Sequence, residues 1–205
     1  DPHPEAIQDR IRRPDGAETV AGQPQIAYRE TITLDADGEH KLIKQTGGRG
    51  QYGHVILKIF PNKRGVGLTT ENKIVGGAIP REYINACMAG IKEATHNGVV
   101  ASYPVVDIHV DLLDGSYHDV DSSEQAFKLA AILATKDAFR KAGSVLLEPI
   151  MAVEVATPDE YQGDIIGDLN RRRGKIGQID SKSGLSIVKS EIPLAEMFGY
   201  STDMR

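Results

Sequence analysis

Residues 46–55 read TGGRGQYGHV, and this stretch decides how the first half of the chain folds. Its glycines indicate a sharp loop, because glycine allows positive φ angles and the close approach of another chain. After the loop, residues 52–60 carry apolar side chains at every second position, as a half-buried strand does. Residues 39–46 precede the loop as a second strand. The stretch therefore predicts the tip of a β-hairpin.

The same glycines also fit G-x-G-x-x-G-x-V, the spacing of loops that cover nucleotide phosphates. A kinase would need a V-A-I-K strand, an H-R-D loop and a D-F-G site, and the sequence contains none of them. A Rossmann loop must open a helix, whereas HVILKIF follows here as a strand, and a Walker loop needs G-K-[ST]. The residues therefore do not support a nucleotide pocket.

Length, composition and net charge limit the classes of protein to which this chain can belong. A length of 205 residues suits two domains, each with its own core. No apolar run approaches the roughly 20 residues of a membrane helix, so we expect no membrane partner. The single cysteine, Cys87, excludes an internal disulfide framework, and we expect a cytoplasmic monomer. A net charge of −5 means that any affinity for nucleic acid must be local.

The spacing of apolar residues and the helix-capping motifs predict the other elements of the first domain. Residues 23–33 predict a strand, and a helix with one apolar face begins at Pro80. Residues 104–112 alternate apolar and polar side chains, as in a strand with one solvated face. A second helix, with a stripe of alanines, opens with a capping box at Ser122 and ends near Gly143, where we place the domain boundary.

In the second domain the sequence predicts a strand over 146–155, then a capping box at 157–160 and a helix that ends at Gly174. A hairpin over 175–192 and a helix from Pro193 follow. The order β-α-β-β-α is a ferredoxin-like split βαβ unit that lacks its last strand. We therefore expect α+β architecture in two domains and interpret the chain as a piece of a longer protein.

Two clusters invite a chemical role. The first holds His118, Asp119, Asp121, Ser122 and Ser123. Neighbouring positions cannot form a triad alone, and with neither a nucleophile elbow nor a second ligand cluster we expect no catalytic residue, metal or cofactor in this chain. The second holds Arg49, Gln51, Tyr52 and His54, whose side chains can contact phosphates, base edges and base faces of RNA. A solvated hairpin with ordinary turn glycines explains the second cluster equally well.

At TGGRGQYGHV, GSYHDVDSSEQAFKLAA, LLEPIMAVEV, GDLNRRRG and PLAEMFGY the sequence closely resembles the C-terminal part of bacterial-type translation elongation factor G. The resemblance implies that 1–22 are the end of the third domain of such a factor. It implies that 23–143 are the fourth domain, with a left-handed βαβ crossover, and that 144–205 are most of a ferredoxin-like fifth domain.

The resemblance also implies a function. In such factors the fourth domain enters the decoding region of the small ribosomal subunit during GTP-dependent translocation of tRNA and mRNA. The matching residues at its tip are Gly48, Arg49, Gly50, Gln51, Tyr52, Gly53, His54, His118 and Asp119. Arg171, Arg172 and Arg173 would contact ribosomal RNA of the large subunit, or else complement a helix dipole in solvent.

GTP hydrolysis, with its Mg²⁺, would belong to an N-terminal domain that this sequence does not contain. The chain itself would then perform no catalysis and hold no cofactor. Two alternatives stay open at this point, namely a relative specialised for ribosome recycling and a stand-alone RNA-binding module.

Overall fold

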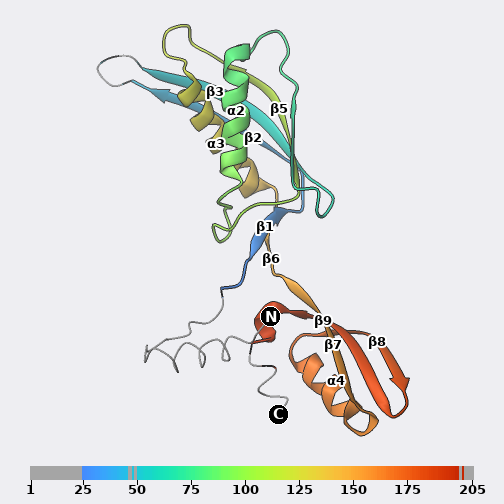
Figure 1. The fold of residues 1–205 in the computed structure, drawn as a ribbon. Helices are drawn as coiled ribbons and strands as arrows, with labels where there is room; N and C mark the ends of the chain where they lie inside the picture. Colours follow the sequence, from blue (N-terminus) through green and yellow to red (C-terminus); the bar gives the residue numbers. More distant parts are fainter. Residues whose placement is uncertain (1–24, 46–47, 49, 199, 201–205) are drawn as a thin grey trace, which may run out of the picture.

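The computed structural model describes residues 25–45, 48, 50–198 and 200, which form two α+β units (Figure 1). The first unit runs from β1 to β6 and the second from β7 to the C-terminal 3₁₀ turn. The expected remnant of a preceding domain at 1–22 and the side chain of Arg49 lie outside the described residues. None of the described helices is both long and apolar enough to cross a bilayer.

The first unit is built on a four-stranded sheet in the order β2-β3-β5-β4. Strands β2 (Ala36–Lys44) and β3 (Gln51–Pro61) form the predicted antiparallel hairpin, and β5 (Ile108–Ser116) pairs antiparallel with β3. The edge strand β4 (Leu68–Asn72) runs parallel to β5. Helix α2 (Arg81–Ala94) connects these two parallel strands, so the expected βαβ crossover is β4-α2-β5.

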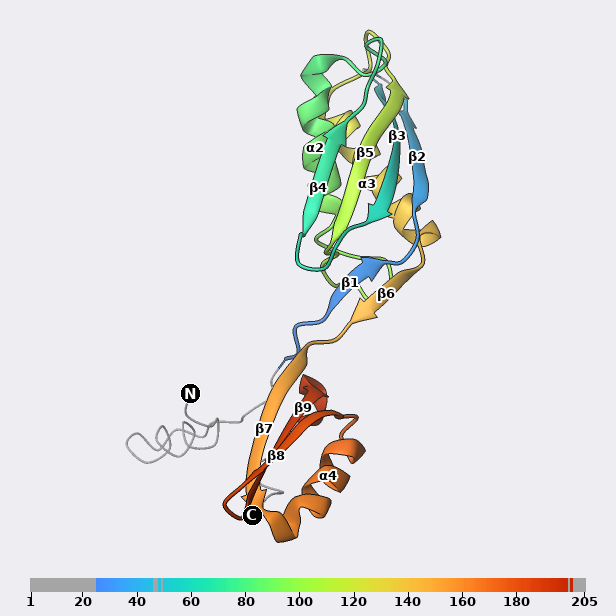
Figure 2. The same ribbon diagram turned by 90° about the vertical axis from the view of Figure 1, so that its right-hand side faces the viewer.

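Helices α2 and α3 (Glu124–Lys141) cover one face of this sheet, and the other face is open (Figure 2). The predicted apolar face of β3 is fully buried against the helices. The two helices pack so closely that a Cβ at Gly90 of α2 would collide with the carbonyl oxygen of Lys128 in α3. The predicted alanine stripe of α3 lines this contact with small side chains.

The N-cap of α3 differs from the prediction. Ser123 caps the helix, and its hydroxyl accepts a hydrogen bond of 3.1 Å from the N–H of Ala126. The hydroxyl of Ser122, the predicted cap, instead donates to the carbonyl oxygen of Tyr52 at 3.0 Å and accepts from the N–H of His118 at 2.9 Å. Ser122 therefore joins two loops and does not cap the helix.

The predicted single strand over 146–155 was wrong. Strand β6 (Ser144–Leu147) pairs antiparallel with β1 (Arg29–Ile32) and belongs to the first unit. Strand β7 (Ile150–Pro158) pairs with a different sheet in the second unit. The chain changes partners at Glu148 and Pro149, so strand pairing continues four residues past the predicted boundary at Gly143.

In its described residues the second unit has the predicted three-stranded sheet and the predicted helix between the first two of these strands. Strand β9 (Leu185–Pro193) lies between β7 and β8 (Lys175–Lys182) and is antiparallel to both. Helix α4 (Gln162–Arg171) joins β7 to β8, and its Ile165 and Leu169 pack on the sheet. This order is the split βαβ arrangement, so the α+β class and the two-unit organisation are confirmed.

The predicted caps of the second unit were wrong. Thr157 is a buried residue of β7 opposite Ser186, and α4 is preceded by a 3₁₀ turn (Asp159–Tyr161) with no side-chain cap. After Pro193 the described chain forms a second 3₁₀ turn (Leu194–Glu196) in place of the start of an α-helix.

Candidate nucleic-acid interface

Two connections meet at one end of the first sheet, the β2–β3 hairpin loop and the segment 117–123 between β5 and α3 (Figure 1). We call this end the tip. An isolated bridge between Tyr52 and Ser122 ties the two connections together. The structure therefore brings His118 and Asp119 beside the glycine hairpin, although about 70 residues separate them in the sequence.

Asp121 binds the backbone at Gly50 and Tyr52, where the glycine loop enters β3. Its Oδ1 accepts a hydrogen bond of 3.1 Å from the N–H of Gly50, and its backbone oxygen accepts one of 2.9 Å from the N–H of Tyr52. A Cβ at Gly50 would lie 3.0 Å from the Asp121 carboxylate, so a larger residue would push the loop away. The contact of Asp121 with the hairpin was not predicted from the sequence.

Gly53 serves packing inside the domain. It is buried, and a Cβ there would lie 2.8 Å from the carbonyl oxygen of Ala126 at the start of α3. The strand can pass this close to the helix only because Gly53 lacks a side chain. Among the described glycines of the motif, Gly48 alone is exposed, and Gly50 is partly covered by Asp121.

Tyr52 and His54 lie on the open face of the sheet and are partly buried. The Tyr52 hydroxyl and the His54 Nδ1 both hydrogen-bond the Ser116 hydroxyl, at 2.7 and 2.9 Å. His54 Nε2 lies 2.8 Å from a carboxylate oxygen of Glu39, and Lys41 lies over the Tyr52 ring at 5.6 Å. The polar atoms of both rings are therefore used to join three strands just below the tip.

His118 projects into solvent from the tip. Its side chain is 54% exposed, and its ring centroid is 6.1 Å from that of Tyr52. Nδ1 accepts from the backbone N–H groups of Val120 and Asp121, at 3.3 Å each. In the neutral ring this places the proton on Nε2, which is left to meet a partner. Gln51 is partly exposed and Asp119 is exposed.

The three arginines after α4 have different environments. Arg172 is largely buried, donates to Asp168 at 2.9 Å and to the Glu196 backbone at 2.8 Å, and stacks on the Tyr200 ring at 4.8 Å. Arg173 donates two hydrogen bonds to Glu148, at 3.0 and 3.1 Å, and its Nε reaches the Glu196 carboxylate at 3.0 Å.

Arg171 is the arginine of this run that faces solvent. Its side chain is 80% exposed, and its only described ion pair is a long one of 3.7 Å with Asp168. A partner of the second unit could therefore reach Arg171 without breaking the internal ion pairs of its neighbours.

A polar network lies on the open face of the first sheet, away from the tip. Carboxylate and imidazole atoms of Glu71, His109 and Asp111 lie within 4.8 Å of one another, a grouping that could hold a metal ion. The ammonium of Lys73 already lies 2.6 Å from Asp111 and 3.4 Å from Glu71. A metal would have to displace this ammonium, so the geometry favours an internal ion pair.

His109, expected on a solvated face, takes part in this network. Its Nδ1 lies 2.8 Å from the Thr69 hydroxyl, and its Nε2 lies 2.9 Å from Asp111. Burial opposes ionisation of the Asp111 carboxyl, but hydrogen bonds from Lys73 and His109 outweigh it and hold its pKa below the ordinary value. Asp111 raises the pKa of Lys73 through the same hydrogen bond.

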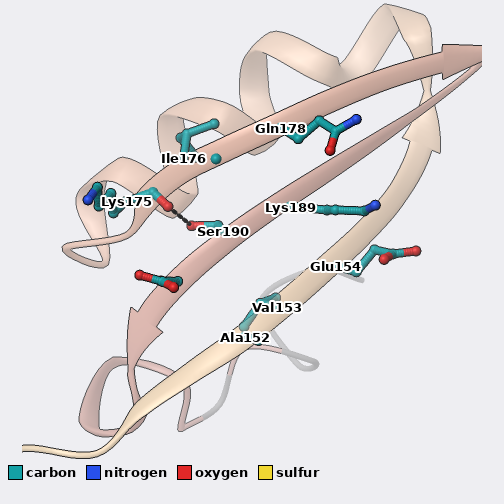
Figure 3. A pocket seen from close by; sticks show the side chains of 10 residues that line it. Ala152, Val153, Glu154, Lys175, Ile176, Gln178, Lys189 and Ser190 are labelled. Carbon is teal, nitrogen blue, oxygen red and sulfur yellow. Dashed lines mark hydrogen bonds between the residues drawn. The ribbon is translucent and has the colours of Figure 1, made fainter. Parts of the chain in front are cut away.

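A hollow of about 580 Å³ lies on the sheet of the second unit (Figure 3). Strands β7, β8 and β9 line it, and Lys189 of β9 lies opposite Glu154 of β7 in the strand register. The Ser190 hydroxyl donates to the Lys175 carbonyl oxygen at 3.1 Å. Charges of both signs alternate across its lining, which marks a mixed polar surface rather than a catalytic pocket.

Cys87 lies on the apolar face of α2 and is fully buried. Burial raises the pKa of its thiol to about 12, so the thiolate is scarce at neutral pH. These surroundings make Cys87 an inert core thiol.

The order of the two units, a crossover domain with a projecting tip followed by a split βαβ domain, defines a class of two-domain α+β proteins. The family model described as elongation factor G, domain IV, matches residues 24–143, and the model for the elongation factor G C-terminus matches 145–205. The chain belongs to the elongation factor G family.

A solved structure agrees with this assignment. A crystal structure of a Thermus thermophilus protein matches with 43% sequence identity and a TM-score of 0.81. The match covers 96% of this chain and 29% of the Thermus chain. This chain thus corresponds to less than a third of that protein, and it forms the domain IV and C-terminal part of an elongation factor G-like translation factor.

Proposed function

We propose that this chain is the ribosome-binding part of a factor that promotes GTP-dependent translocation of tRNA and mRNA. Its tip would enter the decoding region of the small subunit and contact the mRNA and the paired tRNA. GTP and Mg²⁺ would bind in another domain of the same factor. The protein would act as a monomer in the cytoplasm.

The observation that carries this proposal is the construction of the tip. Asp121 fixes the glycine loop through Gly50, and the adjacent 117–123 segment directs the ring of His118 to solvent. An exposed backbone at Gly48 beside an exposed imidazole suits contact with an RNA backbone and its bases, because glycine removes side-chain bulk and imidazole can stack or donate.

The link between the two tip connections suggests how the tip would act. Hydrogen bonds at Gly50, Tyr52 and Ser122 hold the two connections together before they meet RNA. A preformed tip loses less conformational entropy on binding. Such a tip would favour the ribosomal state in which tRNA and mRNA have moved, by binding that state better than the earlier one.

The second unit would contact large-subunit ribosomal RNA through Arg171. Arg172 and Arg173 would support that contact indirectly, because they hold the end of α4 against the turn at Glu196 and the linker at Glu148.

The test is single-round translocation by the complete factor with His118→Ala. If His118 lowers the translocation barrier by about 1.4 kcal/mol, its removal slows the step about tenfold. Ribosome-stimulated GTP hydrolysis should be unchanged, since it belongs to another domain. His96→Ala, an exposed histidine just after α2, is the matched control and should change neither rate.

Translocation at the normal rate in His118→Ala would contradict the proposal. Slowed ribosome recycling together with normal translocation would instead assign the chain to the recycling relative.

A further inference from the structure

A third loop lies at the same end of the first unit as the tip. Residues 73–80 connect β4 to α2, and since β4 and β5 are parallel, this loop leaves the sheet at the end where the 117–123 segment leaves β5 (Figure 1). No motif in the sequence had indicated a function for this loop.

Packing joins the third loop to the tip. A Cβ at Gly115 would lie 2.7 Å from Ile79, so Ile79 seats the loop directly on the end of β5. One turn later, the Tyr83 hydroxyl lies 3.5 Å from the carbonyl oxygen of Ser122, and the Tyr83 ring stacks on Phe127 with centroids 4.9 Å apart. The loop is therefore held at a fixed place beside the tip.

The third loop borders a cavity of about 510 Å³. The residues that line it are Asn72, Ile74, Gly76, Gly77, Ile79, Arg81, Ile84 and Asn85. Arg81 is the one charged residue among them, and no carboxylate from the described part of the chain lines the cavity. The other polar side chains of the lining are the amides of Asn72 and Asn85, of which Asn72 already accepts from the N–H of Ile74 at 3.0 Å.

The charge of Arg81 is not balanced within the described part of the chain. Its side chain is exposed, and no ion pair or hydrogen bond of it occurs among the described residues. The nearby cation Lys73 is different, because Asp111 and Glu71 already neutralise it. The backbone at Gly76 and Gly77 is open, because a Cβ added at either glycine would meet nothing within 4 Å.

We propose that this cavity binds a phosphate of the RNA backbone next to the segment that the tip contacts, with Arg81 as the main ligand. A guanidinium can donate two parallel hydrogen bonds to phosphate oxygens, and an amide and open backbone can add weaker contacts. The proposed contact is with phosphate alone, so it positions the domain on RNA of any sequence. This inference rests on the proposed function of the tip.

The test measures binding of the chain to ribosomes that carry mRNA and tRNA, at several salt concentrations from about 50 to about 200 mM. Arg81→Ala should weaken binding about three- to tenfold and lower the slope of log affinity against log salt by about one. Arg81→Lys should keep most of the slope. Arg64→Ala is the matched control, because Arg64 is an exposed arginine in the β3–β4 turn at the opposite end of the sheet, and it should change neither quantity.

The outcomes separate this inference from the proposed function. If Arg81→Ala behaves like Arg64→Ala while His118→Ala weakens binding, the phosphate site is wrong and the tip stands. If neither Arg81→Ala nor His118→Ala weakens binding, both proposals fail. Thermal unfolding of each variant, expected to match the unmodified chain, excludes loss of fold as the cause.

Discussion

The carboxylate of Asp121 and the backbone N–H of Gly50 are joined by a hydrogen bond of 3.1 Å, across 71 residues of sequence. The same aspartate receives the N–H of Tyr52 on its backbone oxygen. These two hydrogen bonds join the two connections of the tip at Gly50 and Tyr52. The proposed RNA contact depends on this link.

Replacing Asp121 with alanine should release the glycine loop. Loss of one partly buried hydrogen bond should lower the free energy of unfolding by about 0.5–1.5 kcal/mol. Amide hydrogen exchange at Gly50 should become faster, which NMR can measure residue by residue. Asp119→Ala removes an exposed carboxylate two residues away and should alter neither quantity. Unchanged exchange at Gly50 in Asp121→Ala would show that the carboxylate does not hold the loop.

Alanine in place of two glycines inside helices should change stability in opposite directions. Gly90→Ala forces a Cβ against the Lys128 backbone, so we expect overpacking to cost about 1–3 kcal/mol of stability. Gly167→Ala on α4 meets nothing within 4 Å and should stabilise the second unit by about 0.4–1 kcal/mol. Chemical denaturation of both variants checks the pair, and equal effects of the same sign would refute the packing argument.

Stability should depend on pH through Asp111. Its pKa is lowered in the folded chain, so its ion pair with Lys73 stabilises the fold above the unfolded value of about 3.9. That contribution is lost as the pH falls through the unfolded value and then the lower folded value. Asp111→Asn should therefore be less stable than the unmodified chain at pH 7, with a smaller difference at about pH 2. Denaturation curves at both pH values measure the two differences, and equal differences would contradict this account.

The arginines after α4 should contribute differently to stability, because they differ in burial. Arg172→Ala removes charged hydrogen bonds to Asp168 and to the Glu196 backbone, and we expect a loss of about 1.5–3 kcal/mol. Arg171→Ala changes an exposed side chain and should stay within about 0.5 kcal/mol. Thermal unfolding measures both, and a larger loss in Arg171→Ala would reverse our assignment of the two side chains.

Periodicity predicted the elements with a strong apolar pattern. The hairpin, both long helices and the split βαβ order agree with the structure. Strand β4 was not predicted, because Leu68 is its only apolar residue and it lies at a sheet edge. Strand β5 begins at Ile108 rather than near 104, since Asp107 has a φ of 57° and its carboxylate accepts the N–H of Gly67.

The features that could not be predicted depend on distant partners. A residue pattern cannot show that β6 pairs with β1, because apolar residues stand on both sides of Glu148 and Pro149, where the chain changes sheet. The contact between Asp121 and Gly50 was missed for the same reason. The resemblance of TGGRGQYGHV and GSYHDVDSSEQAF to one family indicated both loops, but only the fold shows that they meet.

The measurement that tests the central claim most directly is tethered cleavage of ribosomal RNA by the complete factor carrying iron at one cysteine. Asp119→Cys places the label on the tip, and Arg64→Cys places it at the opposite end of the sheet. Cys87 should stay unlabelled, because it is buried and its thiol pKa is raised to about 12.

We predict cleavage in the decoding region of the small subunit from position 119 and none there from position 64. Cleavage of that region from position 64, or its absence from position 119 in a factor that binds ribosomes, would contradict the account.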